Sequence, residues 1–338
     1  MTELNNIALK IISKGKGILA ADESTGTMTK RLEAVNVPST EENRLFFRKT
    51  LFSSESMKNC IGGVILYDET IKQTSSLKKT IPELISDSGT IPGIKVDTGA
   101  KKQTQLNNET ITEGLDGLSE RLKTYYDLGA RFTKWRGVFK ISIKNNLPSS
   151  ESIKSNAHAL GRYSALVQEA NMVPIVEPEV LMDGNHDIKT CYQVTKIVLQ
   201  ETFNQLSNNN INIKGIILKP NMILNGAESG IKNETKQVAE MTLNCLKENV
   251  PKDVPGIAFL SGGQTELEAT KNLNEINKIN NSNFIMSYSY GRALQQNALK
   301  FWSKNINNIK GTQDTFNHRA NMCSLAAQGK WSEELETK

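Results

Sequence analysis

The sequence predicts a (β/α)₈ barrel with extra helices at its N- and C-terminal ends, a fold of the α/β class. Eight short apolar runs of strand length are spread along the 338 residues, and amphipathic helical patterns separate them. No glycine-rich GxGxxG turn follows the first run, so a closed TIM barrel is favoured over an open dinucleotide-binding sheet. The sequence shows no interdomain linker and no internal repeat. We therefore expect a single domain over residues 1–338, with a helical C-terminal region at about residues 293–338.

The expected elements follow one another in a regular order. The helical spacing of Leu4, Ile7, Ala8, Ile11 and Ile12 predicts an N-terminal helix before the first strand. Two late helices, at about residues 293–304 and 312–328, exceed what eight βα units require and could cover one end of the barrel. The eight strands are expected at residues 17–22, 61–67, 91–97, 130–136, 172–179, 214–221, 256–263 and 284–291.

The strand at residues 214–221 is unusual because its apolar run stops at a single lysine, Lys219, just before Pro220. A lysine at the end of a strand that is buried on both faces keeps little contact with water, which disfavours its charged form. The neutral amine can attack a carbonyl group. From this strand alone, a lysine that extends its ammonium group out to solvent is an equally good interpretation.

Charged residues recur at the C-terminal ends of the other predicted strands. Residues two apart on a strand share a face, and the polar face must be the barrel interior because helices cover the outer one. Active sites of such barrels lie at this mouth, and burying unpaired charges is costly, so a purely structural cluster is the poorer explanation. Lys134 would lie near Lys219, and Glu177 could transfer protons. The residues expected at the mouth are Asp22, Asp97, Glu177, Glu179, Lys95, Lys134, Arg136 and Lys219.

Two loops have the composition of phosphate-binding loops. Residues 260–263 (LSGG) and 289–292 (SYGR) follow the seventh and eighth strands, where barrels commonly hold a phosphate on backbone N–H groups. Arg292 would add a bidentate contact, and Ser24, Thr27 and Lys95 could meet the opposite end of a substrate. Tight turns and helix capping are the structural alternatives for these glycines and hydroxyls.

Charge and hydropathy exclude several other classes of function. The 41 basic and 36 acidic residues give a net charge of 41 − 36 = +5, and they are interspersed, which is weak support for nucleic-acid binding. No apolar segment approaches the roughly 18 residues of a membrane span, and the N-terminus has no signal-peptide core. We expect a soluble protein with no membrane association.

Cysteines and histidines are few and widely spaced. No two cysteines form a CxxC pair, which favours reduced thiols and a cytoplasmic location. No histidine lies at metal-ligand spacing from another histidine or from a cysteine cluster. We therefore expect no metal and no cofactor. The residues concerned are Cys60, Cys191, Cys245, Cys323, His158, His186 and His318.

Together these residues closely resemble the class I fructose-1,6-bisphosphate aldolase family. The resemblance covers about residues 10–330 in the family's order, and such a set is highly specific. The matching motifs lie at residues 17–26 (GILAADESTG), 114–121 (GLDGLSER), 134–136 (KWR), 173–179 (VPIVEPE), 218–222 (LKPNM), 259–264 (FLSGGQ) and 289–294 (SYGRAL).

The resemblance implies a metal-independent lyase that reversibly splits fructose 1,6-bisphosphate into dihydroxyacetone phosphate and glyceraldehyde 3-phosphate, in glycolysis and gluconeogenesis. It implies that Lys219 forms the Schiff base, that Glu177 is the general acid and base, and that Asp22 faces the substrate's C4 hydroxyl. Lys134 and Glu179 match the supporting charges, and Arg136 is expected among the substrate-binding residues. Many members are tetramers, so a homo-oligomer is implied.

The resemblance also assigns residues to the two phosphates of the substrate. Ser24 and Lys95 match the site for one phosphate, and Thr27 stands where some members have serine. The residues that match the ketone-side phosphate site are Arg31, Ser261, Gly262, Gly263, Ser289, Gly291 and Arg292.

The sequence departs from the family in one feature, and it leaves several alternative functions open. Many members have a C-terminal tyrosine that helps move the C3 proton, whereas the last tyrosine here is Tyr290. Another Schiff-base barrel aldolase, acting on a monophosphate sugar or sedoheptulose bisphosphate, would use the same lysine. A catalytically idle scaffold or a pyridoxal-phosphate enzyme are alternatives from other classes.

Overall fold

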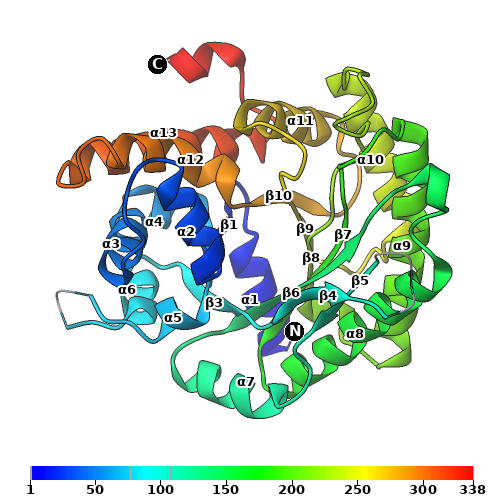
Figure 1. Cartoon of the computed structure of the whole chain (residues 1–338), viewed down its shortest axis with the longest axis horizontal. Coiled ribbons are helices and arrows are strands. Elements are labelled where there is room, and N and C mark those ends of the chain that lie inside the picture. The colour runs from blue at the N-terminus through cyan, green and yellow to red at the C-terminus, as the bar shows by residue number, and fades with distance from the viewer. Residues whose placement is uncertain (1, 76–77, 105, 107–108, 338) are drawn as a thin grey trace.

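The computed structural model describes residues 2–75, 78–104, 106 and 109–337. Eight parallel strands form a closed barrel, which confirms the predicted fold class (Figure 1). Going round the barrel, the strands are hydrogen-bonded in the order β1-β10-β9-β8-β7-β6-β3-β2. They are β1 (Gly17–Ala20), β2 (Ile61–Leu66), β3 (Ile91–Lys95), β6 (Phe132–Phe139), β7 (Val173–Val180), β8 (Ile217–Leu218), β9 (Gly256–Phe259) and β10 (Ile285–Tyr290).

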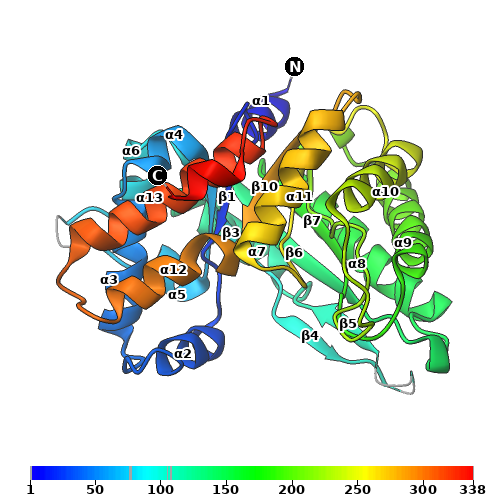
Figure 2. The same ribbon diagram turned by 90° about the horizontal axis from the view of Figure 1, so that it is seen from above.

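Helices surround the barrel on all sides. Helices α2 to α6 lie on one side together with α12 and α13, and α8, α9 and α10 lie on the opposite side (Figure 1, Figure 2). The helices are α1 (Glu3–Ile11), α2 (Thr25–Glu33), α3 (Glu41–Phe52), α4 (Ser56–Cys60), α5 (Asp68–Ile71), α6 (Ile81–Asp87), α7 (Leu118–Asp127), α8 (Ser150–Glu169), α9 (Ile188–Asn208), α10 (Thr235–Asn249), α11 (Glu266–Ile279), α12 (Arg292–Trp302) and α13 (Ile309–Ala326). Within the described residues, none of these helices is both long and apolar enough to cross a membrane.

The N-terminal helix α1 closes one end of the barrel. Its side chains Ala8, Ile11 and Ile12 belong to the same apolar cluster as inward-facing strand residues such as Ile18 and Ile217. Two strand glycines allow this close approach. A Cβ atom added at Gly62 would overlap the backbone of Ile11, and one added at Gly256 would overlap the side chain of Ile12. Apolar packing therefore fills the N-terminal end, and the charged residues lie at the other.

The strand predicted at residues 214–221 is shorter in the structure. A 3₁₀ turn occupies Ile213–Gly215, and the strand β8 contains only Ile217 and Leu218. The Lys219 N–H still donates to the Val176 carbonyl at 2.8 Å, but Pro220 has no N–H with which to continue the ladder. The lysine therefore lies at the point where the strand ends.

The predicted role of the late helices is wrong. Helix α12 directly follows β10 and is the helix of the eighth βα unit, so it does not exceed the barrel's requirement. Helix α13 is additional, and it packs against α3, α4, α11 and α12 on the outer wall and does not cover a barrel end. The sequence also gave no sign of the antiparallel hairpin formed by β4 (Gly99–Lys102) and β5 (Thr110–Glu113), because β4 is polar and mostly exposed.

Candidate active site

A lysine and a glutamate from adjacent strands form the centre of the site. Lys219 directly follows β8 and Glu177 lies on β7, and β7 pairs with β8 so that Ile175 lies beside Ile217. Two residues further along each strand, Lys219 Nζ lies 3.0 Å from Glu177 Oε1. Both side chains are buried, with residue exposures of 4% and 3%. The parallel register therefore places an amine and a proton acceptor in direct contact.

A second lysine joins two carboxylates on the other side of Glu177. Lys134 lies on β6, and its Nζ atom is 2.8 Å from Asp22 Oδ2 and 3.4 Å from Glu177 Oε2. Asp22 follows β1, which is on the opposite side of the closed barrel from β7. The charged groups thus alternate in sign across the mouth, in the order Asp22, Lys134, Glu177 and Lys219.

This alternation determines which groups are charged. Burial alone would raise the pKa of Asp22, but the Lys134 and Lys219 ammonium groups outweigh it and lower that pKa to about 2. Burial would also raise the pKa of Glu177, but the nearby Lys219 and Lys134 outweigh burial and lower that pKa. Burial would lower the pKa of Lys134, but Asp22 and Glu177 raise it well above its usual range. Glu177 is therefore ionised and has a carboxylate oxygen that can accept a proton.

A separate ion pair is formed by Arg136 and Glu179, which lie two residues after Lys134 and Glu177 on β6 and β7. Arg136 Nε donates to Glu179 Oε2, and the register of β6 and β7 places Arg136 beside Glu177. Burial opposes charge on Arg136, but Glu179 raises the pKa of the guanidinium well above its usual range. Arg136 therefore remains a cation at the wall of the groove.

These residues line one groove of about 690 Å³ at the C-terminal end of the barrel. Of the sixteen residues to which a catalytic or substrate-binding role was assigned, fifteen line it: Asp22, Ser24, Thr27, Arg31, Lys95, Lys134, Arg136, Glu177, Glu179, Lys219, Ser261, Gly262, Ser289, Gly291 and Arg292. Gly263 does not. Its φ of +74° is in the left-handed region that favours glycine, and an added Cβ would meet Met182, so a tight turn accounts for it.

Several groups in the groove lack a hydrogen-bond partner among the described residues. The Oγ atom of Ser289 is buried without one, as are Nε and Nη2 of Arg31. The Nη1 atom of Arg31 donates to Glu23, which lies between Asp22 and Ser24. Buried donors without an acceptor are costly, and a phosphate offers several acceptor oxygens.

The helix-capping alternative for Ser24 also holds. Ser24 is the N-cap of α2, and its Oγ accepts a hydrogen bond from the Thr27 backbone N–H at 3.3 Å. Arg292 is exposed, begins α12 and lines the same groove. Two helix N-termini with their positive dipole ends therefore face the same groove.

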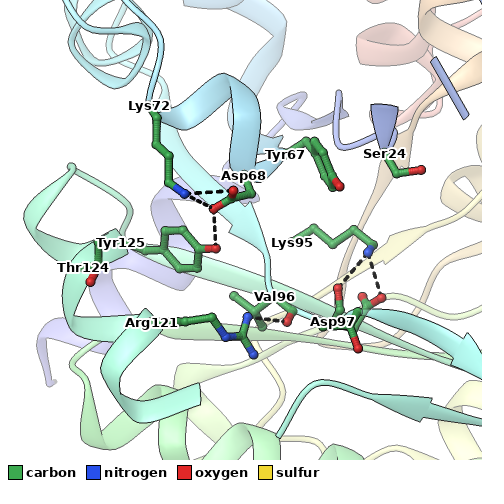
Figure 3. Close-up of a pocket in the computed structure, with 11 residues that line it drawn as sticks. Ser24, Tyr67, Asp68, Lys72, Lys95, Val96, Asp97, Arg121, Thr124 and Tyr125 are labelled. Atoms are coloured by element: carbon green, nitrogen blue, oxygen red, sulfur yellow. Dashed lines mark hydrogen bonds and ion pairs between the residues drawn. The ribbon is translucent and has the colours of Figure 1, made fainter. Parts of the chain in front are cut away.

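Residues without an assigned role also line the groove, among them Glu23, Lys30, Gln296 and Asp97. Asp97 was expected at the mouth but without a role, and it lines the groove beside Lys95. Figure 3 shows the Lys95 ammonium directed at Asp97, with Lys95 Nζ 2.9 Å from Asp97 Oδ1. The signal was present in the sequence, because Lys95 and Asp97 are two residues apart on one strand face. In the described part of the chain, no group of three histidine, cysteine, aspartate or glutamate side chains is arranged to hold a metal ion.

A closed parallel barrel with ionisable side chains gathered at its C-terminal mouth is the architecture of the (β/α)₈-barrel enzymes. The family model described as fructose-bisphosphate aldolase class-I matches residues 3–338. The chain belongs to the class I fructose-bisphosphate aldolase family. It is accordingly a metal-independent lyase of glycolysis, which cleaves fructose 1,6-bisphosphate reversibly through a lysine Schiff base.

Relatives from distant organisms match nearly the whole chain. A probable fructose-bisphosphate aldolase class 1 from Xanthomonas campestris is 47% identical over 97% of this chain and 98% of its own length. The non-muscle aldolase of Lethenteron camtschaticum is 48% identical, over 97% of this chain and 90% of its own. The cytosolic fructose-bisphosphate aldolase 6 of Arabidopsis thaliana is 46% identical, over 97% of this chain and 91% of its own length.

A solved structure is similar in fold as well as in sequence. The aldolase of Plasmodium falciparum, crystallised in a ternary complex with TRAP and a small-molecule inhibitor, superposes with a TM-score of 0.96 at 42% identity. The match covers 98% of this chain and 95% of that one.

Proposed function

We propose that Lys219 is the residue that forms the Schiff base and that Glu177 moves the protons of this step. The Lys219 ammonium first gives a proton to Glu177 Oε1, which lies 3.0 Å away. The neutral amine attacks the C2 carbonyl of the sugar and forms a carbinolamine. Glu177 then returns its proton to the carbinolamine hydroxyl, which leaves as water, and the positively charged imine remains. The single observation that carries this proposal is the Lys219–Glu177 contact.

Asp22 and Lys134 serve the cleavage step in this proposal. Asp22 takes the proton of the C4 hydroxyl, the C3–C4 bond breaks, and its electron pair flows into the imine to give an enamine. Lys134 holds the Asp22 and Glu177 carboxylates on either side of its ammonium, at 2.8 and 3.4 Å. The aldehyde product leaves first, and protonation of the enamine at C3 followed by hydrolysis releases dihydroxyacetone phosphate.

In this proposal the two phosphates bind to two different sets of residues in the groove. Ser289 and Arg292, with Arg31, Ser261, Gly262 and Gly291, take the ketone-side phosphate. Ser24, Thr27 and Lys95 take the C6 phosphate, which we call the distal phosphate, and Arg136 with Glu179 lines the wall. The buried, unpartnered Oγ of Ser289 supports the first assignment, because a phosphate oxygen would accept its hydrogen bond.

Borohydride trapping tests the central assignment. The protein is incubated with dihydroxyacetone phosphate, reduced, digested and mapped by mass spectrometry. We expect the label on Lys219, and we expect activity to survive EDTA because the imine supplies the electron sink. Label on Lys134 or Lys95 would contradict the assignment.

We further propose that the chain acts as one domain, residues 1–338, in a cytoplasmic homo-oligomer. The full-length matches support the single domain, and the cytosolic relatives support the location. Sedimentation equilibrium would test the assembly, and a monomer at micromolar concentration would contradict it.

A further inference from the structure

A side pocket of about 600 Å³ adjoins the catalytic groove (Figure 3). Its wall is formed by residues that follow β1, β2 and β3 and by helix α7, including Tyr67, Asp68 and Tyr125. Three residues, Ser24, Lys95 and Asp97, line both the side pocket and the groove. Lys95 therefore lies at the boundary between two spaces, and its flexible four-carbon side chain could reach into either.

Asp97 holds the Lys95 ammonium at this boundary with two contacts. Lys95 Nζ donates to the Asp97 backbone carbonyl at 2.8 Å and lies 2.9 Å from Oδ1 of the same residue. An ammonium has three N–H donors, so two are used, and the third meets no acceptor among the described residues. The Lys95 side chain is 18% exposed and the Asp97 side chain only 3%, so the lysine is accessible and its partner is buried.

Asp97 is itself fixed by the surrounding backbone. Its Oδ1 accepts a hydrogen bond from the Gly99 N–H at 3.1 Å, and the Thr98 N–H donates to the Glu113 carbonyl at 2.9 Å. At the residue before Asp97, Arg121 Nη1 donates to the Val96 carbonyl at 2.9 Å. The carboxylate that receives the lysine is therefore a rigid anchor and not a mobile surface group.

We propose that Asp97 is a positioning residue that holds the Lys95 ammonium at the groove, so that its remaining N–H can bind the distal phosphate of the sugar bisphosphate. The inference rests on the proposed function, in which Lys95 binds that phosphate. Without Asp97, the ammonium turns toward solvent or into the side pocket, where the Asp68 carboxylate is the other anion. Ordering a lysine side chain in advance reduces the entropy lost when the phosphate binds.

The charge of Asp97 makes this proposal distinguishable from a simpler one. A carboxylate next to a phosphate site repels the phosphate. If Asp97 acted only through its charge, its removal would strengthen binding of the bisphosphate. If it positions Lys95, its removal weakens that binding, and only for substrates that carry the distal phosphate.

The test compares fructose 1,6-bisphosphate with fructose 1-phosphate, which lacks the distal phosphate, in the full-length Asp97→Asn variant. The asparagine can still accept the Gly99 hydrogen bond, so the backbone keeps its anchor. We expect KM for the bisphosphate to rise about threefold to tenfold and KM for the monophosphate to stay within about twofold. A lower KM for the bisphosphate, or an equal rise for both sugars, would overturn the proposal. Should Asp97→Asn fail to fold, Asp97→Glu displaces the carboxylate by one methylene and is expected to give the same selective rise.

Two controls complete the design. Asp68→Asn removes the same kind of carboxylate from the same pocket, where Asp68 Oδ1 lies 2.8 Å from Lys72 Nζ, and it should leave both KM values unchanged (Figure 3). In a Lys95→Met background, Asp97→Asn should have no additional effect, and an additive effect would show that Asp97 does not act through Lys95. If wild-type trapping labels Lys219 but Lys95→Met leaves the preference for the bisphosphate unchanged, this inference fails while the Schiff-base assignment stands.

Discussion

Lys219 Nζ lies 3.0 Å from Oε1 of Glu177, and the two residues come from neighbouring parallel strands. The other oxygen of the same carboxylate lies 3.4 Å from Lys134. One buried carboxylate thus serves two ammonium groups, which together keep it ionised. The amine that we propose as the nucleophile is therefore in direct contact with the carboxylate that we propose as its base.

Glu177→Gln should slow imine formation strongly. The amide has the shape of the carboxylate but cannot accept the proton of Lys219, and a positioned general base typically contributes about 10²–10⁴-fold to such a step. The measurement is the rate at which dihydroxyacetone phosphate becomes trappable by borohydride on Lys219. Glu179→Gln, whose carboxylate pairs with Arg136, should slow trapping far less. Equal trapping rates in wild type and Glu177→Gln would assign the proton transfer to another group.

Asp22 should contribute acid sensitivity to folding. Its pKa is about 2 in the folded protein against an ordinary 3.8, so its stabilisation is complete above pH 3.8 and is lost as the pH falls toward 2. The difference corresponds to about 2 kcal/mol of unfolding free energy. Urea unfolding followed from pH 5 to pH 2 should show a shallower loss of stability in Asp22→Asn than in wild type. Asp253→Asn, in an exposed pair with Lys214, is the matched control and should follow the wild-type curve.

Arg292→Ala should weaken binding of the bisphosphate about tenfold and binding of an unphosphorylated sugar much less, because a charge-assisted contact to phosphate is lost. Isothermal titration of each sugar would measure the difference. Lys300→Ala removes an exposed cation from the same helix, away from the groove, and should change neither affinity. Similar losses for both sugars in Arg292→Ala would refute the phosphate role.

Glu336→Gln should destabilise the fold without changing catalysis. Arg319, which is nearly buried, donates to both carboxylate oxygens of Glu336 at 2.9 Å, and Trp331 Nε1 donates to Oε1 at 2.7 Å. Loss of the carboxylate charge leaves the Arg319 cation without its ion-pair partner, at an expected cost of about 2 kcal/mol. A lower melting temperature with normal cleavage rates is the expected result. Glu334→Gln, on the same 3₁₀ turn but exposed, should melt like wild type.

Periodicity in the sequence was enough to predict the barrel, because strands buried on both faces must be apolar and the helices that cover them must be amphipathic. The same argument placed Lys219, Glu177 and Lys134 at one end, since residues two apart share a strand face. Periodicity did not predict the parts of the fold where the local sequence has no regular apolar pattern. The hairpin of β4 and β5 is polar, and the packing of α13 on the outer wall depends on α3 and α4, which are far away in the chain.

Residue type and spacing along the chain were enough to establish the fold class, the family and which residues carry the charges of the site. Which charges pair with one another depends on the folded barrel. Closure of the barrel and the register of its strands place Asp22 against Lys134, and Glu177 between Lys134 and Lys219. Residue spacing cannot predict these distances, since the partners lie on strands that are many residues apart and meet only when the sheet closes. The ionisation of each group follows from those distances, because electrostatic interactions in a buried site depend on the separation of the charges.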